Sequence, residues 1–177
     1  MVTTKFGCHS QSLQGVTESL TVPLFGYLAR CGVRVDVGIK PVVLIVDDDK
    51  DIRDILSKIA ESRLNADVYQ TESGKEALDL LHRHHIDVII CDLGMPVMGG
   101  VNFYETLRSR AVTTPVIFLT GQSQEAAPKL FSLGAYDFLQ KPFNTEDLCI
   151  LLEDAYKTSQ RLHKIRDEKK RGLDEAS

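Results

Sequence analysis

The chain has 177 residues, of which 43% are apolar and 26% are charged, and its formal net charge at pH 7 is −4. This length suffices for one well-buried domain with extensions, and the acidic balance argues against a dedicated nucleic-acid surface. No apolar run approaches the roughly 18 residues that a membrane-spanning helix needs. The four cysteines show neither a CxxC pair nor zinc-finger spacing. Scattered thiols fit a reducing compartment, so we expect a cytoplasmic protein without a membrane or nucleic-acid partner.

Residues 1–40 show no sustained hydrophobic period of either 2 or 3.6. They mix Ser, Thr, Gly and Gln with weak apolar clusters, which favours a poorly ordered extension. From residue 41 the pattern becomes regular. A continuous apolar run at 42–46 predicts a buried parallel strand, and the acidic run 47–49 follows it. Apolar residues then recur at helical spacing over 52–60.

Residues 66–70 predict the second strand, which has the weakest pattern. Ser73, with Glu76 three residues later, predicts a capping box that opens the next helix. Residues 86–91 then predict a buried strand that delivers Asp92 at its carboxyl end.

A loop rich in glycine and proline follows Asp92, since Gly94, Pro96, Gly99 and Gly100 prevent the strand from continuing. Beyond it the sequence predicts a helix at 101–108, a strand at 115–119, a helix at 126–131 and a strand at 135–139. Strand and helix therefore alternate five times, which indicates a doubly wound α/β fold with a five-stranded parallel sheet.

The last helix is expected to begin near Asn144 and to extend beyond the domain. An apolar face is predicted at alternating spacings of three and four residues, formed by Leu148, Leu151, Ala155, Thr158, Leu162 and Ile165. Residues 159–177 are either a helical extension of this face, through which the chain would form a homodimer, or a solvated polar tail.

The predicted strands share a property at their carboxyl ends, which is where ligands bind in open parallel sheets. These ends carry Asp47, Asp48, Asp92, Thr120 and Lys141. Two carboxylates about 4 Å apart repel by about 4 kcal/mol at an effective dielectric near 20, so a positive group must offset them. A hard divalent cation and the lysine fit that need, and they suit an aspartyl nucleophile that attacks phosphorus. Taken singly, an acidic run after a strand is more often a solvated helix N-terminus.

Four short segments carry a specific resemblance. They are V-D-D at 46–48, D-L-G-M-P at 92–96, F-L-T-G at 118–121 and F-L-Q-K-P-F at 138–143. In order and spacing they resemble the receiver domain of two-component response regulators, over about residues 41–158. The resemblance implies the flavodoxin-like receiver topology, in a receiver of the single-domain type.

The resemblance also implies roles for individual residues. Asp92 matches the phosphoacceptor, which takes a phosphoryl group from a histidine kinase or a phosphotransfer protein. Asp47 and Asp48 match the acidic pair that holds Mg2+, with Mn2+ as an alternative ion. Asp92 and the backbone carbonyl of Gly94 complete that implied ligand set.

Three further residues match the family's switch and charge-pairing positions. Thr120 matches the hydroxyl that turns toward the phosphoryl group, and Lys141 matches the lysine that pairs with it. Phe138 matches the aromatic residue whose rotamer reports the phosphorylated state. By resemblance the chain is a signalling switch rather than an enzyme, with chemistry limited to its own phosphorylation and dephosphorylation. A downstream protein would bind the face formed by the helix at 126–131, the strand at 135–139 and the last helix.

One departure from the family pattern follows the phosphoacceptor. The common M-P-x-M-D-G reads M-P-V-M-G-G at 95–100, so Gly99 stands where the family has Asp. We expect this difference to change only the start of the following helix.

Two other readings of the acidic residues remain open. In a haloacid-dehalogenase-like phosphatase, Asp47 would be the nucleophile and Asp49 the general acid, but Asp51 stands where that family has Thr or Val, and Asp92 goes unexplained. A docking module with a degenerate site would lack a site residue, and all are present here. Four histidines have no metal-ligand spacing and are interpreted as helix-surface residues, namely His82, His84, His85 and His163.

Overall fold

The computed structural model describes residues 40–96, 98–121 and 127–174, so the expectation for residues 1–39 lies outside the described residues. Five parallel strands form one sheet in the order β2-β1-β3-β4-β5. They are β1 (Val42–Val46), β2 (Asp67–Thr71), β3 (Val88–Asp92), β4 (Val116–Thr120) and β5 (Asp137–Gln140). This is the strand order of the flavodoxin-like doubly wound fold, so the predicted fold class is confirmed.

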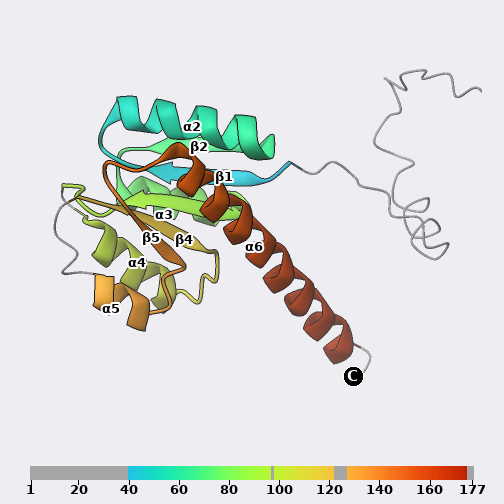
Figure 1. The fold of residues 1–177 in the computed structure, drawn as a ribbon. Helices are drawn as coiled ribbons and strands as arrows, with labels where there is room; N and C mark the ends of the chain where they lie inside the picture. The colour runs from blue at the N-terminus through green and yellow to red at the C-terminus, as the bar shows by residue number, and fades with distance from the viewer. Residues whose placement is uncertain (1–39, 97, 122–126, 175–177) are drawn as a thin grey trace, which may run out of the picture. The chain divides into compact units, whose positions relative to one another are not determined.

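Helices cover both faces of the sheet (Figure 1). They are α2 (Lys50–Leu64), α3 (Gly74–Arg83), α4 (Gly100–Ser109), α5 (Ala127–Ser132) and α6 (Thr145–Asp174). One core cluster joins the sheet to α2 and α6, and a second joins its other face to α3, α4 and α5. β1, β3 and β4 are almost fully buried between these layers, as their continuous apolar runs require. None of the helices in the described ranges is long and apolar enough to cross a membrane.

β3 begins two residues later than the sequence predicts. Its pairing with β1 starts at Val88 opposite Val43. Before that point Asp87 bonds to Val42 in two ways: its amide donates to the Val42 carbonyl at 2.8 Å, and its Oδ2 accepts the Val42 amide at 2.9 Å. The carboxylate therefore takes the place of the next ladder bond and ends the strand pairing there.

The capping box predicted at the start of α3 is only half formed, and this expectation was wrong in part. Ser73 caps the helix, because its side chain accepts the Lys75 amide at 3.2 Å. Glu76 does not reach back to the Ser73 amide but accepts the hydroxyl of Thr71 at 2.7 Å. That hydroxyl oxygen accepts the Ser73 amide at 3.2 Å, so Thr71 replaces Glu76 as the partner of this amide.

α6 begins as predicted, since Asn144 Oδ1 accepts the Glu146 amide at 3.0 Å, but its buried face differs from the predicted one. The fully buried positions are Leu148, Leu152, Ala155 and Ser159. Leu151 and Thr158 are half-buried, and Ile165 is 50% exposed. The predicted positions recur, on average, at a spacing shorter than the 3.6 residues of one helical turn. Along a straight helix they therefore move progressively around its surface and away from the side that faces the sheet. The helix itself continues to Asp174.

The buried face of α6 contains a polar group that offers a test of this packing. The Ser159 hydroxyl is buried without a hydrogen-bond partner among the described residues. We expect Ser159→Ala to raise the free energy of unfolding by about 0.5–1 kcal/mol, because it removes an unsatisfied hydroxyl and improves helix propensity. Urea unfolding followed by circular dichroism measures the change.

Ser57 provides the matched control for that substitution. It is also buried, on α2, but its hydroxyl donates to the Arg53 carbonyl at 2.8 Å and accepts a hydrogen bond from the side-chain Nε2 of Gln70 at 2.7 Å. Ser57→Ala should therefore lower the free energy of unfolding by about 1–2 kcal/mol. If both substitutions destabilise the protein equally, the Ser159 hydroxyl has a partner and our assignment of the α6 face is wrong.

Candidate functional site

The carboxyl ends of the sheet bring together the polar residues that the sequence singled out. Asp47 directly follows β1, Asp92 ends β3, Thr120 ends β4 and Lys141 directly follows β5. Backbone hydrogen bonds hold these ends in register: the Lys141 amide donates to the Thr120 carbonyl at 2.7 Å, and the amide after Asp92 donates to the carbonyl before Thr120 at 2.9 Å. The side chains therefore meet at one edge, as expected for an open parallel sheet.

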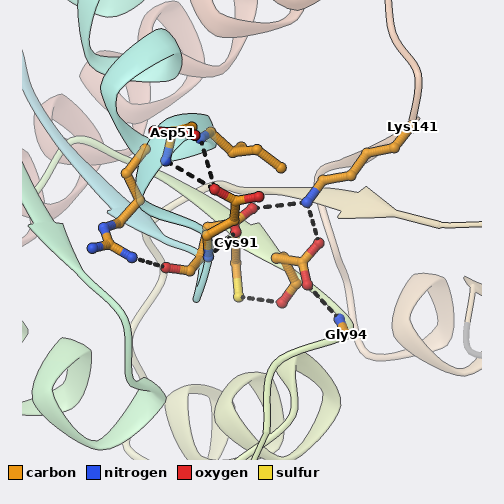
Figure 2. A network of polar contacts seen from close by, with 9 residues as sticks. Asp51, Cys91, Gly94 and Lys141 are labelled. Carbon is orange, nitrogen blue, oxygen red and sulfur yellow. Dashed lines mark hydrogen bonds and ion pairs between the residues drawn. The ribbon is translucent and has the colours of Figure 1, made fainter.

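Lys141 lies between the two buried carboxylates (Figure 2). Its Nζ is 2.8 Å from Asp47 Oδ2 and 2.6 Å from Asp92 Oδ1. The Asp47 and Asp92 side chains are only 1% and 9% exposed, and that of Lys141 is 23% exposed. One ammonium thus offsets the mutual repulsion of both carboxylates in a partly desolvated site.

Backbone amides satisfy the other oxygen of each carboxylate. Asp47 Oδ1 accepts the Asp49 amide at 2.9 Å, and Asp92 Oδ2 accepts the Gly94 amide at 2.6 Å. These bonds fix the orientation of both side chains. A Cβ at residue 94 would lie 3.1 Å from Asp92 Oδ2, so glycine at this position keeps one side of the carboxylate open.

The electrostatics of the site follow from its burial and its ion pairs. Burial raises the pKa of Asp47, although hydrogen bonds from Lys141 and the Asp49 amide oppose the change. Burial lowers the pKa of Lys141, but its bonds to Asp47 and Asp92 outweigh this effect and leave the pKa above its ordinary value. Lys141 therefore remains a cation at neutral pH.

Two neighbours of the site were not anticipated from the sequence. Arg53, on α2, donates from Nη1 to the Asp47 carbonyl at 2.7 Å, and its place one turn into α2 was the only signal for it. Cys91 is fully buried behind Asp92, and its Sγ donates to the Asp92 carbonyl at 3.2 Å. Burial raises the pKa of the Cys91 thiol well above its ordinary value, so this thiol is not a nucleophile at neutral pH.

The acidic run after β1 divides into residues with different roles. Asp48 is exposed, and among the described residues its carboxylate makes no hydrogen bond or ion pair. Asp49 is the N-cap of α2, because its Oδ1 accepts the amides of Asp51 at 2.8 Å and Ile52 at 3.4 Å. An N-cap held by two amides is poorly placed to act as the general acid that a phosphatase mechanism requires.

The donors at this edge suit a hard cation. The carboxylates of Asp47, Asp48 and Asp92 and the carbonyl of Gly94 are all oxygen ligands, which Mg2+ prefers over nitrogen and sulfur. Asp48 offers an unpaired carboxylate at the exposed side, beside two carboxylates that a single ammonium bridges. The residues present therefore fit the ion that the sequence predicts.

The two predicted switch residues lie on neighbouring strands. The Thr120 side chain is buried, and its hydroxyl donates to the Gly121 carbonyl at 3.2 Å. Phe138 is half-buried on β5, with its ring centroid 5.5 Å from Phe118 and 4.5 Å from Phe131. Phe131 is 53% exposed, because α5 directs Leu130 rather than Phe131 into the core.

Comparison with known proteins extends this picture. A family model described as response regulator receiver domain matches residues 43–153. The chain is 32% identical over 125 residues to "Regulatory protein AtoC" of Escherichia coli, covering 70% of this chain. It is 33% identical over 107 residues to "Cell cycle transcriptional regulator CtrA" of Caulobacter vibrioides, covering 60% of this chain. The solved receiver domain of Francisella response regulator 1452 is 36% identical, with a TM-score of 0.61, and the match covers 67% of this chain and 98% of that one.

The two curated relatives are much longer than the region they share with this chain. The match covers 27% of the Escherichia coli protein and 46% of the Caulobacter protein. This chain therefore spans only about a quarter to a half of the length of these relatives.

Proposed function

Because this chain belongs to the response regulator receiver domain family, we propose that it is a phosphorylation-dependent signalling switch with Asp92 as phosphoacceptor. The observation that carries the proposal is the placement of Asp92. Its carboxylate ends a buried strand, is held by Lys141 and the Gly94 amide, and stands beside Asp47 at the carboxyl edge of the sheet.

The proposed chemistry is a transfer of one phosphoryl group. A carboxylate oxygen of Asp92 attacks the phosphorus of a phosphohistidine, the phosphorus–nitrogen bond breaks, and the imidazole nitrogen keeps the electron pair. Lys141 neutralises charge on the group as it moves. Asp47, Asp48, Asp92 and the Gly94 carbonyl would hold Mg2+ or Mn2+, which supplies further positive charge at the phosphoryl oxygens.

The phosphorylated protein carries added negative charge at a site where Asp47 and Asp92 already share the ammonium of Lys141. Phosphorylation adds about −1.5 to −2 charge and three acceptor oxygens at Asp92. Lys141 then pairs with the phosphoryl group, and the Thr120 hydroxyl turns from the Gly121 carbonyl toward it. This movement at the end of β4 frees space into which the ring of Phe138 rotates.

The surface around Phe138 fits the binding of a partner protein. On α5, Phe131 is 53% exposed and its ring lies beside the half-buried Phe138, and Leu133, just beyond α5, is 36% exposed. On α6, Ile150 is 56% exposed. Exposed large apolar side chains of this kind are found at protein interaction sites. We assign the output face to α5, β5 and α6, with a histidine kinase or phosphotransfer protein as the phosphoryl donor.

Receiver domains are signalling domains, and the chemistry we propose for this one is confined to its own aspartate. The exposed apolar residue Ile165, near the end of α6, also fits a homodimer through that helix. Analytical ultracentrifugation with and without phosphorylation would measure whether the dimer forms.

Intact-mass spectrometry tests the proposed function. The protein is incubated with acetyl phosphate, a small phosphoryl donor, with and without Mg2+. We expect one phosphoryl adduct per chain that requires Mg2+, is stable in acid and is released by hydroxylamine, as an acyl phosphate is. A protein that gains no adduct under these conditions would be a docking module that works without phosphorylation.

Metal binding predicts a second measurable effect. Mg2+ at a hundredfold excess over its dissociation constant should raise the free energy of unfolding by about 2.7 kcal/mol, because the ion binds only the folded site. Asp47→Asn should lose most of this increment, since it removes a buried ligand. Asp79→Asn, which changes an exposed acid on α3, should retain it. An equal increment in Asp47→Asn and wild type would place the ion elsewhere.

A further inference from the structure

A second cluster of metal-ligating side chains lies at the opposite end of β3 from Asp92. It consists of His85, Asp87 and His163, whose ligand atoms all lie within 4.8 Å of one another. Asp87 directly precedes β3, and five residues at about 3.3 Å each place the cluster roughly 16 Å from Asp92. The expectation that these histidines are helix-surface residues was wrong for His85, which lies in the loop between α3 and β3, whereas His163 does lie on α6. Both have potential metal-ligand partners that the sequence did not reveal.

Asp87 is held as a metal-binding carboxylate would be. Its side chain is only 9% exposed, and its Oδ2 accepts the Val42 amide at 2.9 Å. The other oxygen, Oδ1, faces both imidazoles, at 3.2 Å from His85 Nε2 and 3.8 Å from His163 Nδ1. One oxygen thus fixes the orientation of the carboxylate while the other remains for a ligand.

His163 approaches this carboxylate without bonding to it. A separation of 3.8 Å is too long for a hydrogen bond, and no other hydrogen-bond partner of its Nδ1 is found among the described residues. His163 follows Ser159 by four residues, so it continues the buried face of α6. Burial, with a contribution from His85, lowers the pKa of His163, so the ring is neutral near pH 7.

The distances suit a tetrahedral ion. Two ligand atoms about 2.1 Å from such an ion are about 3.4 Å apart, and the two carboxylate–imidazole separations, 3.2 Å and 3.8 Å, lie within about 0.4 Å of that value. All three ligand atoms lie within 4.8 Å of one another, so the two imidazoles turn toward each other when the ion binds. The imidazole centroids are 4.5 Å apart, so the two rings contact each other beside Asp87. Two histidines and one carboxylate form a donor set of zinc sites that keep a fourth position for water.

Access to the cluster is open. A hollow of about 250 Å³ beside it is lined by both histidines together with Thr113, Thr114 and Arg166. The His85 side chain is 55% exposed, so an ion can enter from solvent. Arg166 adds positive charge that opposes the ion, whereas Asp87 and Asp167 add negative charge near His163 that favours it. Arg166 is exposed, so solvent reduces its effect on the ion.

We propose that His85, Asp87 and His163 bind a divalent transition-metal ion of the zinc class. The ion joins the start of β3 to His163 of α6, a residue that lies beyond the range 43–153 covered by the family model. It therefore fastens the C-terminal half of α6 to the sheet, far from the phosphoacceptor.

Co2+ is the probe, because a tetrahedral Co2+ site with nitrogen ligands absorbs visible light and Zn2+ displaces the ion. The full chain is titrated in excess Mg2+, which occupies the acidic site around Asp92. We expect one Co2+ per chain, displaced by one Zn2+. His85→Ala and His163→Ala should each weaken binding by about 100-fold or more, since loss of an outer-shell partner alone costs 10–100-fold.

Two controls separate this site from others. His82→Ala removes a nearby histidine outside the cluster, and Asp92→Asn changes the acidic site, so both should bind Co2+ as wild type does. Circular dichroism without metal should show that both cluster variants fold, because the side chains they lose are 55% and 27% exposed. Zn2+ should also slow amide hydrogen exchange in α6 beyond residue 159 in wild type only.

Other results would overturn the proposal. Co2+ binding that survives both His85→Ala and His163→Ala would place the ion on other ligands, such as those in residues 1–39. A signal lost in Asp92→Asn would place it in the acidic site. Wild-type protein that shows no tetrahedral Co2+ band would mean that the cluster binds no such ion.

Discussion

Asp92→Asn should abolish the phosphoryl adduct while leaving the fold intact. The amide of Asn has the shape of the carboxylate and keeps an oxygen for the Gly94 amide, which Asp92 accepts at 2.6 Å. It lacks the anionic oxygen that attacks phosphorus, so the reaction with acetyl phosphate and Mg2+ has no nucleophile. Intact mass should show the adduct at the level of a sample without donor.

Asp49→Asn is the matched control, because it makes the same chemical change at a neighbouring acid. Asn caps helices as well as Asp does, so α2 should begin as before. Our account expects this variant to form the wild-type adduct. The phosphatase alternative assigns Asp49 as general acid and Asp47 as nucleophile. An adduct that persists in Asp92→Asn and is lost in Asp47→Asn would favour that alternative.

Gly100→Ala should strongly destabilise the protein. A Cβ at residue 100 would lie 2.7 Å from the Asp92 carbonyl oxygen, and 2.9 Å and 3.0 Å from atoms of Leu93. Two of these three atoms belong to the backbone and cannot rotate away. We expect a loss of about 3 kcal/mol in the free energy of unfolding, the upper end of the range for overpacked sites. Because the clash falls on Asp92 itself, the rate of adduct formation should also decrease.

Gly99→Asp tests the adjacent position with a larger side chain. The nearest atoms to a Cβ there are 3.7 Å and 3.8 Å away, and Gly99 is the N-cap of α4 without a side-chain hydrogen bond. An aspartate would supply that bond, so stability should rise by a few tenths of a kcal/mol.

Equal stability of Gly100→Ala and wild type in urea unfolding would contradict the close packing of this loop. These contacts leave room for a side chain at residue 99, and the expectation that the Gly99 departure affects only the start of the next helix stays a prediction.

Much of the fold follows from the sequence because its strongest signals are local. The apolar runs that became β1, β3 and β4 are long enough to indicate buried strands on their own. Once the sheet is parallel, strand ends share one edge, so Asp47, Asp92, Thr120 and Lys141 could be placed together before any distance was known. The family resemblance then named roles for the same residues.

The sequence could not supply features that depend on long-range geometry. That Lys141 bridges two carboxylates, rather than contacting one, depends on how far β5 lies from β1 and β3. The side chain of Glu76 bonds to Thr71 because β2 ends beside the start of α3, which the capping-box pattern does not encode.

The histidine cluster shows the same limit most clearly. His85 and His163 are far apart in the sequence and meet only because α6 packs along the sheet beside the start of β3. Their spacing matches no local metal motif, so a search by spacing passes over them. No signal in the sequence pointed to His163, because the predicted face of α6 ran through Thr158 and Leu162, whereas His163 lies four residues after the buried Ser159.

The most direct test of the central claim is to identify the modified residue chemically. Protein treated with acetyl phosphate and Mg2+ is reduced with borohydride, which converts an aspartyl phosphate to homoserine, and is then sequenced by tandem mass spectrometry. We expect homoserine at position 92 and at no other acid. Homoserine at position 47 with Asp92 unmodified would contradict it.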